Sequence, residues 1–160
     1  MRNEDVTIRA ANATDLEAID AIIEACVMRW NLPQRVKRLA LGSYLYGRHD
    51  LEFMEILLAV GADGEINGLA ALETAADGEL STGRKGLLLH GLYVKPQLQG
   101  RGIGSRLVSA AVDAVLAHGL DGLLVKAQND ATGFFEAYGF EPMPVGDSAV
   151  DYANRWWKSV

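Results

Sequence analysis

The chain has 160 residues, 49% of them hydrophobic, so it can bury one sizeable core, and its length predicts a single domain over residues 1–160. Its formal net charge of -6 opposes binding to a phosphate backbone, and no apolar run is long enough to cross a membrane. We therefore expect a cytoplasmic protein whose partners are neither nucleic acids nor membranes.

The N-terminal half predicts a strand, two helices and an antiparallel hairpin. The strand alternates apolar and polar residues, the helices carry apolar residues at helical intervals, and the hairpin segments are apolar runs around a turn. Cys26 is the single cysteine and lies on the apolar side of the first helix, so we expect it to pack in the core. These elements cover residues 6–11, 15–30, 34–46, 53–60 and 66–73.

The central stretch combines a strand, a glycine-rich loop and a long helix. An apolar strand over 87–94 ends before Pro96, and glycines occupy alternate positions in the loop 99–104. Glycine permits backbone conformations that are closed to other residues and lets the chain lie against a ligand. A helix begins at Ile103, and its first turn has unpaired N–H groups that suit phosphate oxygens. The stretch therefore predicts a phosphate-binding loop.

Two common phosphate loops do not fit. A Walker A loop requires a lysine before Ser or Thr, and no lysine precedes Ser105. A dinucleotide fingerprint requires a third glycine at the position of Ser105. The remaining C-terminal elements are a strand over 120–127, a helix over 129–138, an extended piece from Phe140 and a final strand over 155–160.

The loop and its flanks resemble the acetyl-CoA-binding motif of the GNAT superfamily of N-acetyltransferases. The matching pattern is a valine at 94, proline at 96 and Gln-Gly-Arg-Gly-Ile-Gly over 99–104, followed by the helix. The resemblance implies an α/β (α+β) fold with a mixed, mostly antiparallel sheet of about seven strands, flanked by four helices and splayed at the central strand. It also implies acetyl-CoA as cosubstrate, no metal, and coenzyme contacts from Leu92, Tyr93, Val94, Gln99, Gly100, Arg101, Gly102, Ile103, Gly104, Ser105, Asn129 and Phe135.

Gly91 interrupts the central strand and predicts a β-bulge. By the resemblance, the strand parts from its neighbour there, and the backbones of Leu92 and Val94 contact the pantetheine arm. A backbone N–H near Leu92 then polarises the thioester carbonyl. The alternative is that Gly91 only relieves crowding against a helix.

His90 is the leading candidate for the catalytic base. It shares strand parity with Leu92 and Val94, and the family often places an acid or base in this part of the strand. An imidazole can accept a proton from an ammonium group near neutral pH. The alternative is a hydrogen-bonded core histidine, with the amine deprotonated through ordered water.

A second pattern, from Asn129 to Phe140, resembles the family's other signature with one departure. Phe135 stands where the family usually has a tyrosine that protonates the leaving thiolate. Tyr138 lies three residues later and is the candidate acid, although helical spacing gives it another direction. The alternative is release of the thiolate to solvent, because a thiol pKa of about 8.5 makes it a tolerable leaving group.

The resemblance predicts direct acetyl transfer from acetyl-CoA to the amine of a small metabolite. A protein N-terminus or lysine is an alternative acceptor, and a non-catalytic CoA-binding sensor or partner module is an alternative function. By the resemblance, the acceptor pocket is expected at the junction of the first two helices and in the loop before the last strand, where Asp147 and Asp151 can attract a cationic amine. The residues of these segments are Trp30–Pro33, Tyr44, Tyr46 and about Met143–Tyr152. Homodimer formation is left open.

Overall fold

The computed structural model describes residues 5–76, 80, 83–126, 132–143 and 155–160. Contacts within the chain gather into two compact units, which we describe separately. Unit 1 comprises Met1–Ala71 and Gly91–Val108, and unit 2 comprises Leu72–His90 and Ser109–Val160. The single domain predicted from chain length stays a prediction.

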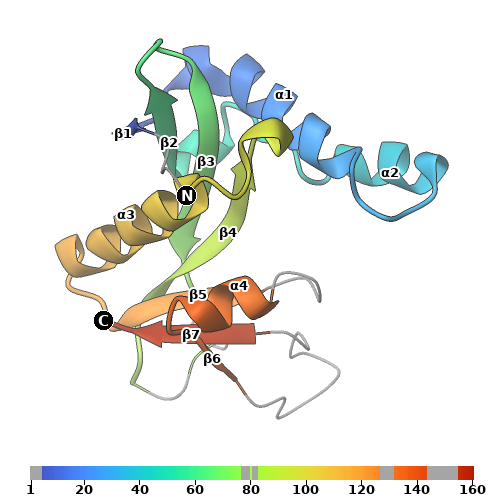
Figure 1. The fold of residues 1–160 in the computed structure, drawn as a ribbon. Helices are drawn as coiled ribbons and strands as arrows, with labels where there is room; N and C mark the ends of the chain where they lie inside the picture. The colour runs from blue at the N-terminus through green and yellow to red at the C-terminus, as the bar shows by residue number, and fades with distance from the viewer. Residues whose placement is uncertain (1–4, 77–79, 81–82, 127–131, 144–154) are drawn as a thin grey trace. The chain divides into compact units, whose positions relative to one another are not determined.

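The described residues form seven strands in one sheet and four α-helices (Figure 1). The strand order is β1-β2-β3-β4-β5-β7-β6, and the β4–β5 pair is parallel whereas β1–β2, β5–β7 and β6–β7 are antiparallel. The predicted fold class and element order are confirmed. The elements are β1 (Val6–Ala10), α1 (Leu16–Val27), α2 (Gln34–Leu41), β2 (Glu55–Gly61), β3 (Ile66–Thr74), β4 (Gly86–Val94), α3 (Ile103–Ala117), β5 (Gly122–Lys126), α4 (Thr132–Ala137), β6 (Glu141–Pro142) and β7 (Arg155–Ser159).

The core of unit 1 lies between α1 and the strands β2 and β3. The apolar stripe of α1 is almost fully buried, since Ile19, Ile23 and Val27 each have 0% exposure. Cys26 belongs to the same buried cluster, and its Sγ donates a hydrogen bond of 3.2 Å to the Val94 carbonyl. The core-packing role predicted for Cys26 is confirmed.

The second helix is shorter than the sequence predicts. Helix α2 ends at Leu41 rather than near residue 46, and the chain then turns through Gly42. The reason is tertiary, because Tyr46 is buried and its amide donates a 3.2 Å hydrogen bond to the Asp20 carboxylate of α1. The chain leaves the helix so that this tyrosine can enter the core.

The core of unit 2 forms around β5, which pairs with the first half of β4 and with β7. Its buried cluster contains Ala75, Leu88, Leu124 and Trp157. Within the described residues, the pairing of β4 with β5 covers Gly86–Leu89, so it ends before the last five residues of β4.

Candidate coenzyme and active site

The glycine loop lies in unit 1 and joins β4 to α3 through a 3₁₀ turn at Pro96–Leu98. Gly100 and Gly102 adopt left-handed conformations, with φ values of 80° and 86°, which strain any side chain. The Gln99 side chain donates a 3.1 Å hydrogen bond to the Val94 carbonyl and so braces the loop against the end of the strand. Ile103, only 1% exposed, anchors the start of α3 in the core.

This loop fits a pyrophosphate group. Gly100 faces open space, because a Cβ built there would have no atom within 4 Å. The loop then enters the first turn of a 15-residue helix, whose free amides and partial positive charge favour an anion. Arg101 is exposed beside these amides, and Gly104 and Ser105 are half-buried in the first turn. The residues over 99–105 would therefore hold the pyrophosphate of a coenzyme through their backbone.

Strand β4 has one residue more than the part of β3 that it opposes. The Ala75 amide donates to the Gly86 carbonyl at one end (3.0 Å), and the Lys95 amide donates to the Asn67 carbonyl at the other (2.9 Å). Eight positions separate Asn67 from Ala75, and nine separate Gly86 from Lys95. An extra residue on one strand of an antiparallel pair marks a β-bulge. A bulge is therefore present in β4, and its assignment to Gly91 stays a prediction.

The space beside Gly91 is filled by tyrosines. A Cβ built on Gly91 would lie 2.6 Å from the Tyr46 hydroxyl and 2.8 Å from Cε2 of Tyr93. Such distances are too short for a real Cβ, so no residue other than glycine fits without movement of its neighbours. Gly91 thus relieves crowding, but the neighbour is a tyrosine hydroxyl and not the helix that the sequence suggested as the alternative.

The residues after Gly91 continue towards the loop. Leu92, Tyr93 and Val94 are half-buried in unit 1, together with the glycine loop. The ring of Tyr93 packs against the α1 core, and burial raises its pKa to about 12, with smaller contributions in the same direction from Tyr44 and Cys26. Tyr93 therefore stays protonated across the neutral range.

The candidate acids and bases lie in unit 2. His90 is the last residue of that unit in β4, and its side chain is exposed. Tyr138 is 37% exposed and follows α4, with its ring 4.8 Å from that of Phe134. Phe135 is 5% exposed and packs edge-on against Phe140, so its described role is in the core of unit 2. Asn129, Asp147 and Asp151 lie outside the described residues.

Sequence reasoning did not anticipate the contact between Tyr46 and Gly91, or the support that Asp20 gives it. Burial raises the pKa of the Asp20 carboxyl, although the hydrogen bond from the Tyr46 amide acts in the opposite direction. No local signal relates these residues, since 45 positions separate Tyr46 from Gly91. Within the described part of the chain, no group of three or more His, Cys, Asp or Glu side chains is arranged to hold a metal.

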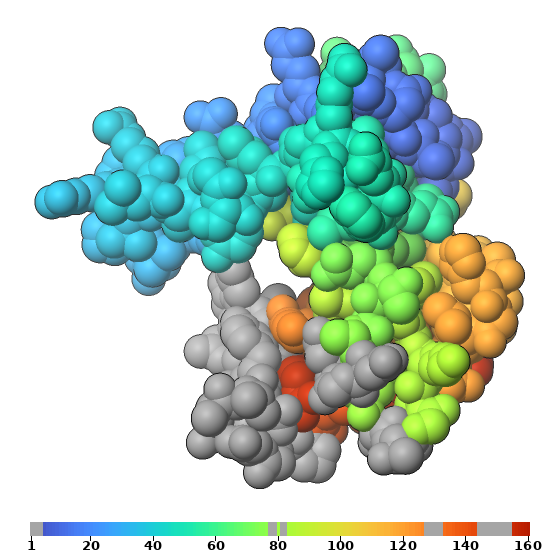
Figure 2. Space-filling view, turned by 180° about the vertical axis from the view of Figure 1, so that it is seen from behind, coloured from blue at the N-terminus to red at the C-terminus, as the bar shows by residue number. Residues whose placement is uncertain are grey.

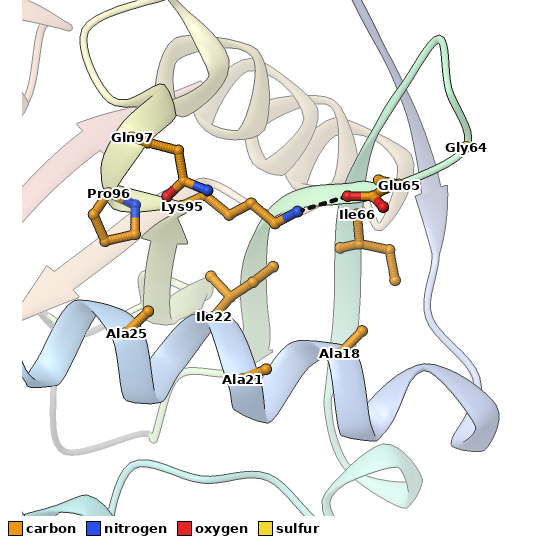
Figure 3. Close-up of a pocket in the computed structure, with 10 residues that line it drawn as sticks. All are labelled: Ala18, Ala21, Ile22, Ala25, Gly64, Glu65, Ile66, Lys95, Pro96 and Gln97. Carbon is orange, nitrogen blue, oxygen red and sulfur yellow. Dashed lines mark hydrogen bonds and ion pairs between the residues drawn. The ribbon is translucent and has the colours of Figure 1, made fainter.

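A separate pocket of about 470 Å³ opens in unit 1 between α1, the β2–β3 turn and the start of the Pro96 turn (Figure 3). Three exposed alanines of α1 and the buried Ile22 form one wall, and an ion pair of 3.2 Å between Lys95 and Glu65 crosses its other side. None of the predicted site residues lines it. Its lining residues are Ala18, Ala21, Ile22, Ala25, Gly64, Glu65, Ile66, Lys95, Pro96 and Gln97.

A family model described as an acetyltransferase (GNAT) domain matches residues 55–142, which span β2 to β6 and include the glycine loop. The chain belongs to the GNAT acetyltransferases. This GNAT protein is an acetyl-CoA-dependent N-acetyltransferase, which confirms the resemblance stated from the sequence. A comparison with curated proteins finds no match to the chain.

Solved structures share the fold of this GNAT protein over nearly its whole length. The PaiA N-acetyltransferase from Thermoplasma acidophilum, in complex with coenzyme A, matches with a TM-score of 0.76 at 16% identity, covering 98% of this chain and 99% of that chain. A GCN5-related N-acetyltransferase from Rhodopseudomonas palustris gives 0.74 at 22% identity, covering 100% and 99%. AtaT complexed with acetyl-methionyl-tRNAfMet gives 0.62 at 20% identity, covering 97% and 95%.

Proposed function

We propose that this acetyltransferase moves the acetyl group of acetyl-CoA directly to the primary amine of a small metabolite. The observation that carries the proposal is the glycine loop at the N-terminus of α3, placed directly after a strand that contains a bulge. In this proposal the amides over 99–105 hold the pyrophosphate, and the main chain of Leu92 and Val94 holds the pantetheine arm. The cosubstrate supplies a thioester, which an uncharged amine can attack.

His90 is the base in this proposal. Its imidazole accepts a proton from the acceptor ammonium, directly or through water, and the free amine then attacks the carbonyl carbon. The new C–N bond forms, the C–S bond breaks, and the electron pair leaves with the thiolate. The attacking nitrogen then loses its second proton to solvent, which leaves a neutral amide. The exposed position of His90 beside the stretch that contains the bulge supports this role, because the imidazole can reach solvent and exchange its proton there.

His90→Ala tests this assignment. We expect turnover to fall roughly 10²-fold to 10⁴-fold, the usual effect of a positioned proton acceptor, with nearly unchanged affinity for acetyl-CoA. The acidic limb of the pH–rate profile should move towards the pKa of the acceptor amine, because the variant has no imidazole to accept the proton. His49→Ala is the matched control, because His49 is an exposed histidine of unit 1 that pairs with Glu52. Unchanged turnover and an unchanged profile in His90→Ala would assign deprotonation to water.

A macromolecular acceptor is the second candidate, and one surface favours it. Residues 25–49 contain five arginines and lysines and no aspartate or glutamate, although the whole chain has a net charge of -6. In this segment Arg35 and Arg38 are exposed beside Leu39, which is 75% exposed. Neither arginine forms an ion pair with a carboxylate of the described residues. Figure 2 shows α2 standing out from the rest of unit 1.

An acceptor panel separates the candidates. Free thiol release should be measured with small amines, amino acids, peptides with free N-termini or lysines, and aminoacyl-tRNA. The double variant Arg35→Glu/Arg38→Glu should lower kcat/KM for an anionic macromolecular acceptor more than for a small amine, because charge steering acts mainly on large anionic partners. A protein that binds acetyl-CoA but releases no thiol with any member of the panel would be the non-catalytic CoA-binding module.

The location and partners belong to the same proposal. No helix in the described residues is long and apolar enough to cross a membrane. A cytoplasmic location, expected from the composition, is part of this proposal, and a small-metabolite acceptor would involve no nucleic acid. The presence or absence of a homodimer can be measured directly by light scattering on the full chain.

A further inference from the structure

The hydroxyl of Tyr46 lies directly against the backbone of β4 at Gly91. A Cβ on that glycine would come within 2.6 Å of the oxygen, so only the absence of a side chain lets the hydroxyl reach the strand. Tyr46 and Gly91 both belong to unit 1, as do Leu92 and the glycine loop. The contact therefore places a proton-bearing group beside the stretch of strand that the proposed function gives to the thioester.

Contacts with α1 hold the ring and the backbone of Tyr46 in place. Tyr46 is 5% exposed and packs in the α1 core, so its ring has little freedom. The Asp20 carboxylate accepts a hydrogen bond from the Tyr46 backbone amide at 3.2 Å, which holds the segment between α2 and β2 against α1. A group held in this way can be aimed at a reacting atom without a further loss of conformational freedom.

The departing thiolate needs a proton, and the other tyrosine candidates serve this need less well. Phe135 has no hydroxyl and is packed in the core of unit 2, and Tyr138 is exposed with its ring against Phe134. The ring of Tyr93 packs against the α1 core, and burial raises its pKa to about 12. Among the described residues, the titratable groups packed around Tyr46 include Asp20 and Cys26 on α1, Tyr44 before it and Tyr93 on β4.

We propose that Tyr46 donates the proton to the thiolate that leaves when acetyl is transferred. As the C–S bond breaks, the sulfur keeps the electron pair and takes the hydroxyl proton of Tyr46, giving the free thiol of coenzyme A. The acceptor nitrogen loses two protons to solvent, one of them through the base, and the phenolate recovers one proton from solvent, so one proton is released in each turnover. This assignment rests on the proposed acetyl transfer and names the general acid of that reaction.

Tyr46→Phe removes the proton and keeps the ring. We expect turnover to fall by roughly 10²-fold to 10⁴-fold, with the dissociation constant for acetyl-CoA nearly unchanged by calorimetry. The basic limb of the pH–rate profile should also move, because the wild type loses activity when its acid ionises and the variant has no such acid. Tyr44→Phe removes another tyrosine hydroxyl from the same core and should leave the basic limb in place.

A binding measurement tests the contact without turnover. In the complex with coenzyme A, the ultraviolet absorbance of the thiolate reports the pKa of the bound thiol. A hydroxyl that donates to the thiolate stabilises the charged form, so this pKa should be lower in the wild type than in Tyr46→Phe. Tyr44→Phe should give the wild-type value. The same pKa in the wild type and in Tyr46→Phe would overturn the proposal.

Gly91→Ala tests whether the glycine exists to admit this hydroxyl. The added methyl should lower the melting temperature of the wild type more than that of the Tyr46→Phe protein, because the phenylalanine lacks the oxygen that the methyl meets. Equal losses in both backgrounds would contradict the contact. A wild-type protein that releases no thiol with any amine would contradict the proposed function, whereas an unchanged thiol pKa in Tyr46→Phe contradicts only the role of Tyr46.

Discussion

The glycines of the loop and the glycines of the strands are required for opposite reasons. Gly100 has a φ of 80° and open space around it, so a methyl group would fit but the backbone would be strained. Gly91, Gly86 and Gly122 have no positive φ, yet a Cβ on any of them would meet a neighbour at an impossible distance. The loop therefore uses glycine for conformation, and the strands use it for room.

The difference follows from what each region would have to accommodate in the proposed reaction. A loop that must present its amides to a phosphate needs a backbone free of side chains on its outer face. A strand that must receive a large ring needs a missing side chain on its inner face. In unit 2 the ring is that of Trp157, which lies over Gly86 and Gly122, and in unit 1 it is that of Tyr46 over Gly91. In both strand sites a missing side chain makes room for a ring, but only the ring of Tyr46 places a hydroxyl against the strand.

The largest effect is expected at the loop, for Gly104→Val. Gly104 is the second residue of α3, and a branched side chain there should block two or three amide contacts to the pyrophosphate. Charge-assisted hydrogen bonds of about 1.5–3 kcal/mol each make this a loss of at least about 100-fold in acetyl-CoA affinity. Calorimetry measures the affinity, and circular dichroism shows whether the variant is folded.

Gly133→Val is the matched control for this change. Gly133 is the second residue of α4 and has open space around it. Valine at this position changes the intrinsic helix propensity as it does at Gly104, but Gly133 is not an expected coenzyme contact. A folded Gly104→Val protein with wild-type affinity would show that the loop does not bind the coenzyme.

A smaller effect, on stability, is expected for Gly122→Ala. The methyl would meet the Lys158 carbonyl and the Trp157 ring, and a backbone carbonyl in a sheet cannot move aside. Overpacking of this kind costs about 1–3 kcal/mol, which corresponds to a fall of about 2–12 °C in Tm. Gly42→Ala is the contrast, because Gly42 has a helical φ of -57° and open space, so alanine should stabilise by about 0.4–1 kcal/mol. Similar Tm values for the two variants would show that the space around these glycines does not decide whether alanine is tolerated.

The smallest effect is expected for Gly100→Ala, where only the backbone resists. The left-handed conformation should cost about 1–2 kcal/mol, seen as a modest fall in Tm. Gly100→Asn should recover part of the loss, since asparagine tolerates this conformation better than alanine. An asparagine variant less stable than the alanine variant would mean that space and not φ limits this position.

The sequence predicted the fold and the glycine-rich turn before α3 because their signals are local. The proline, the alternate glycines and the apolar helix that begins at Ile103 all lie within one short segment, and the structure shows the turn and helix there. The prediction that the second helix reaches residue 46 was wrong, because the end of this helix depends on a contact between residues far apart in the sequence. Its apolar pattern continues past Gly42, but the tertiary contact of Tyr46 with Asp20 directs the chain elsewhere.

The distribution of charge along the chain is more informative than the net charge. A net charge of -6 argues against anionic partners only if the charge is spread evenly, and here the segment 25–49 is free of carboxylates. The sequence shows this uneven distribution of charge. The structure adds that Arg35 and Arg38 on α2 are exposed, so that their charges face solvent. The choice between a small and a macromolecular acceptor therefore depends on this surface more than on the overall charge.

The sequence by itself determined the family, the order of the elements and the position of the glycine loop, because these depend on residues close together in the chain. Only the tertiary structure decided which side chains meet at the central strand. Tyr46 reaches Gly91 across 45 positions, and Phe135 is taken up in the core of unit 2 by contacts with Phe140. Such contacts are set by the packing of whole helices and strands, and no short-range pattern of residues encodes them.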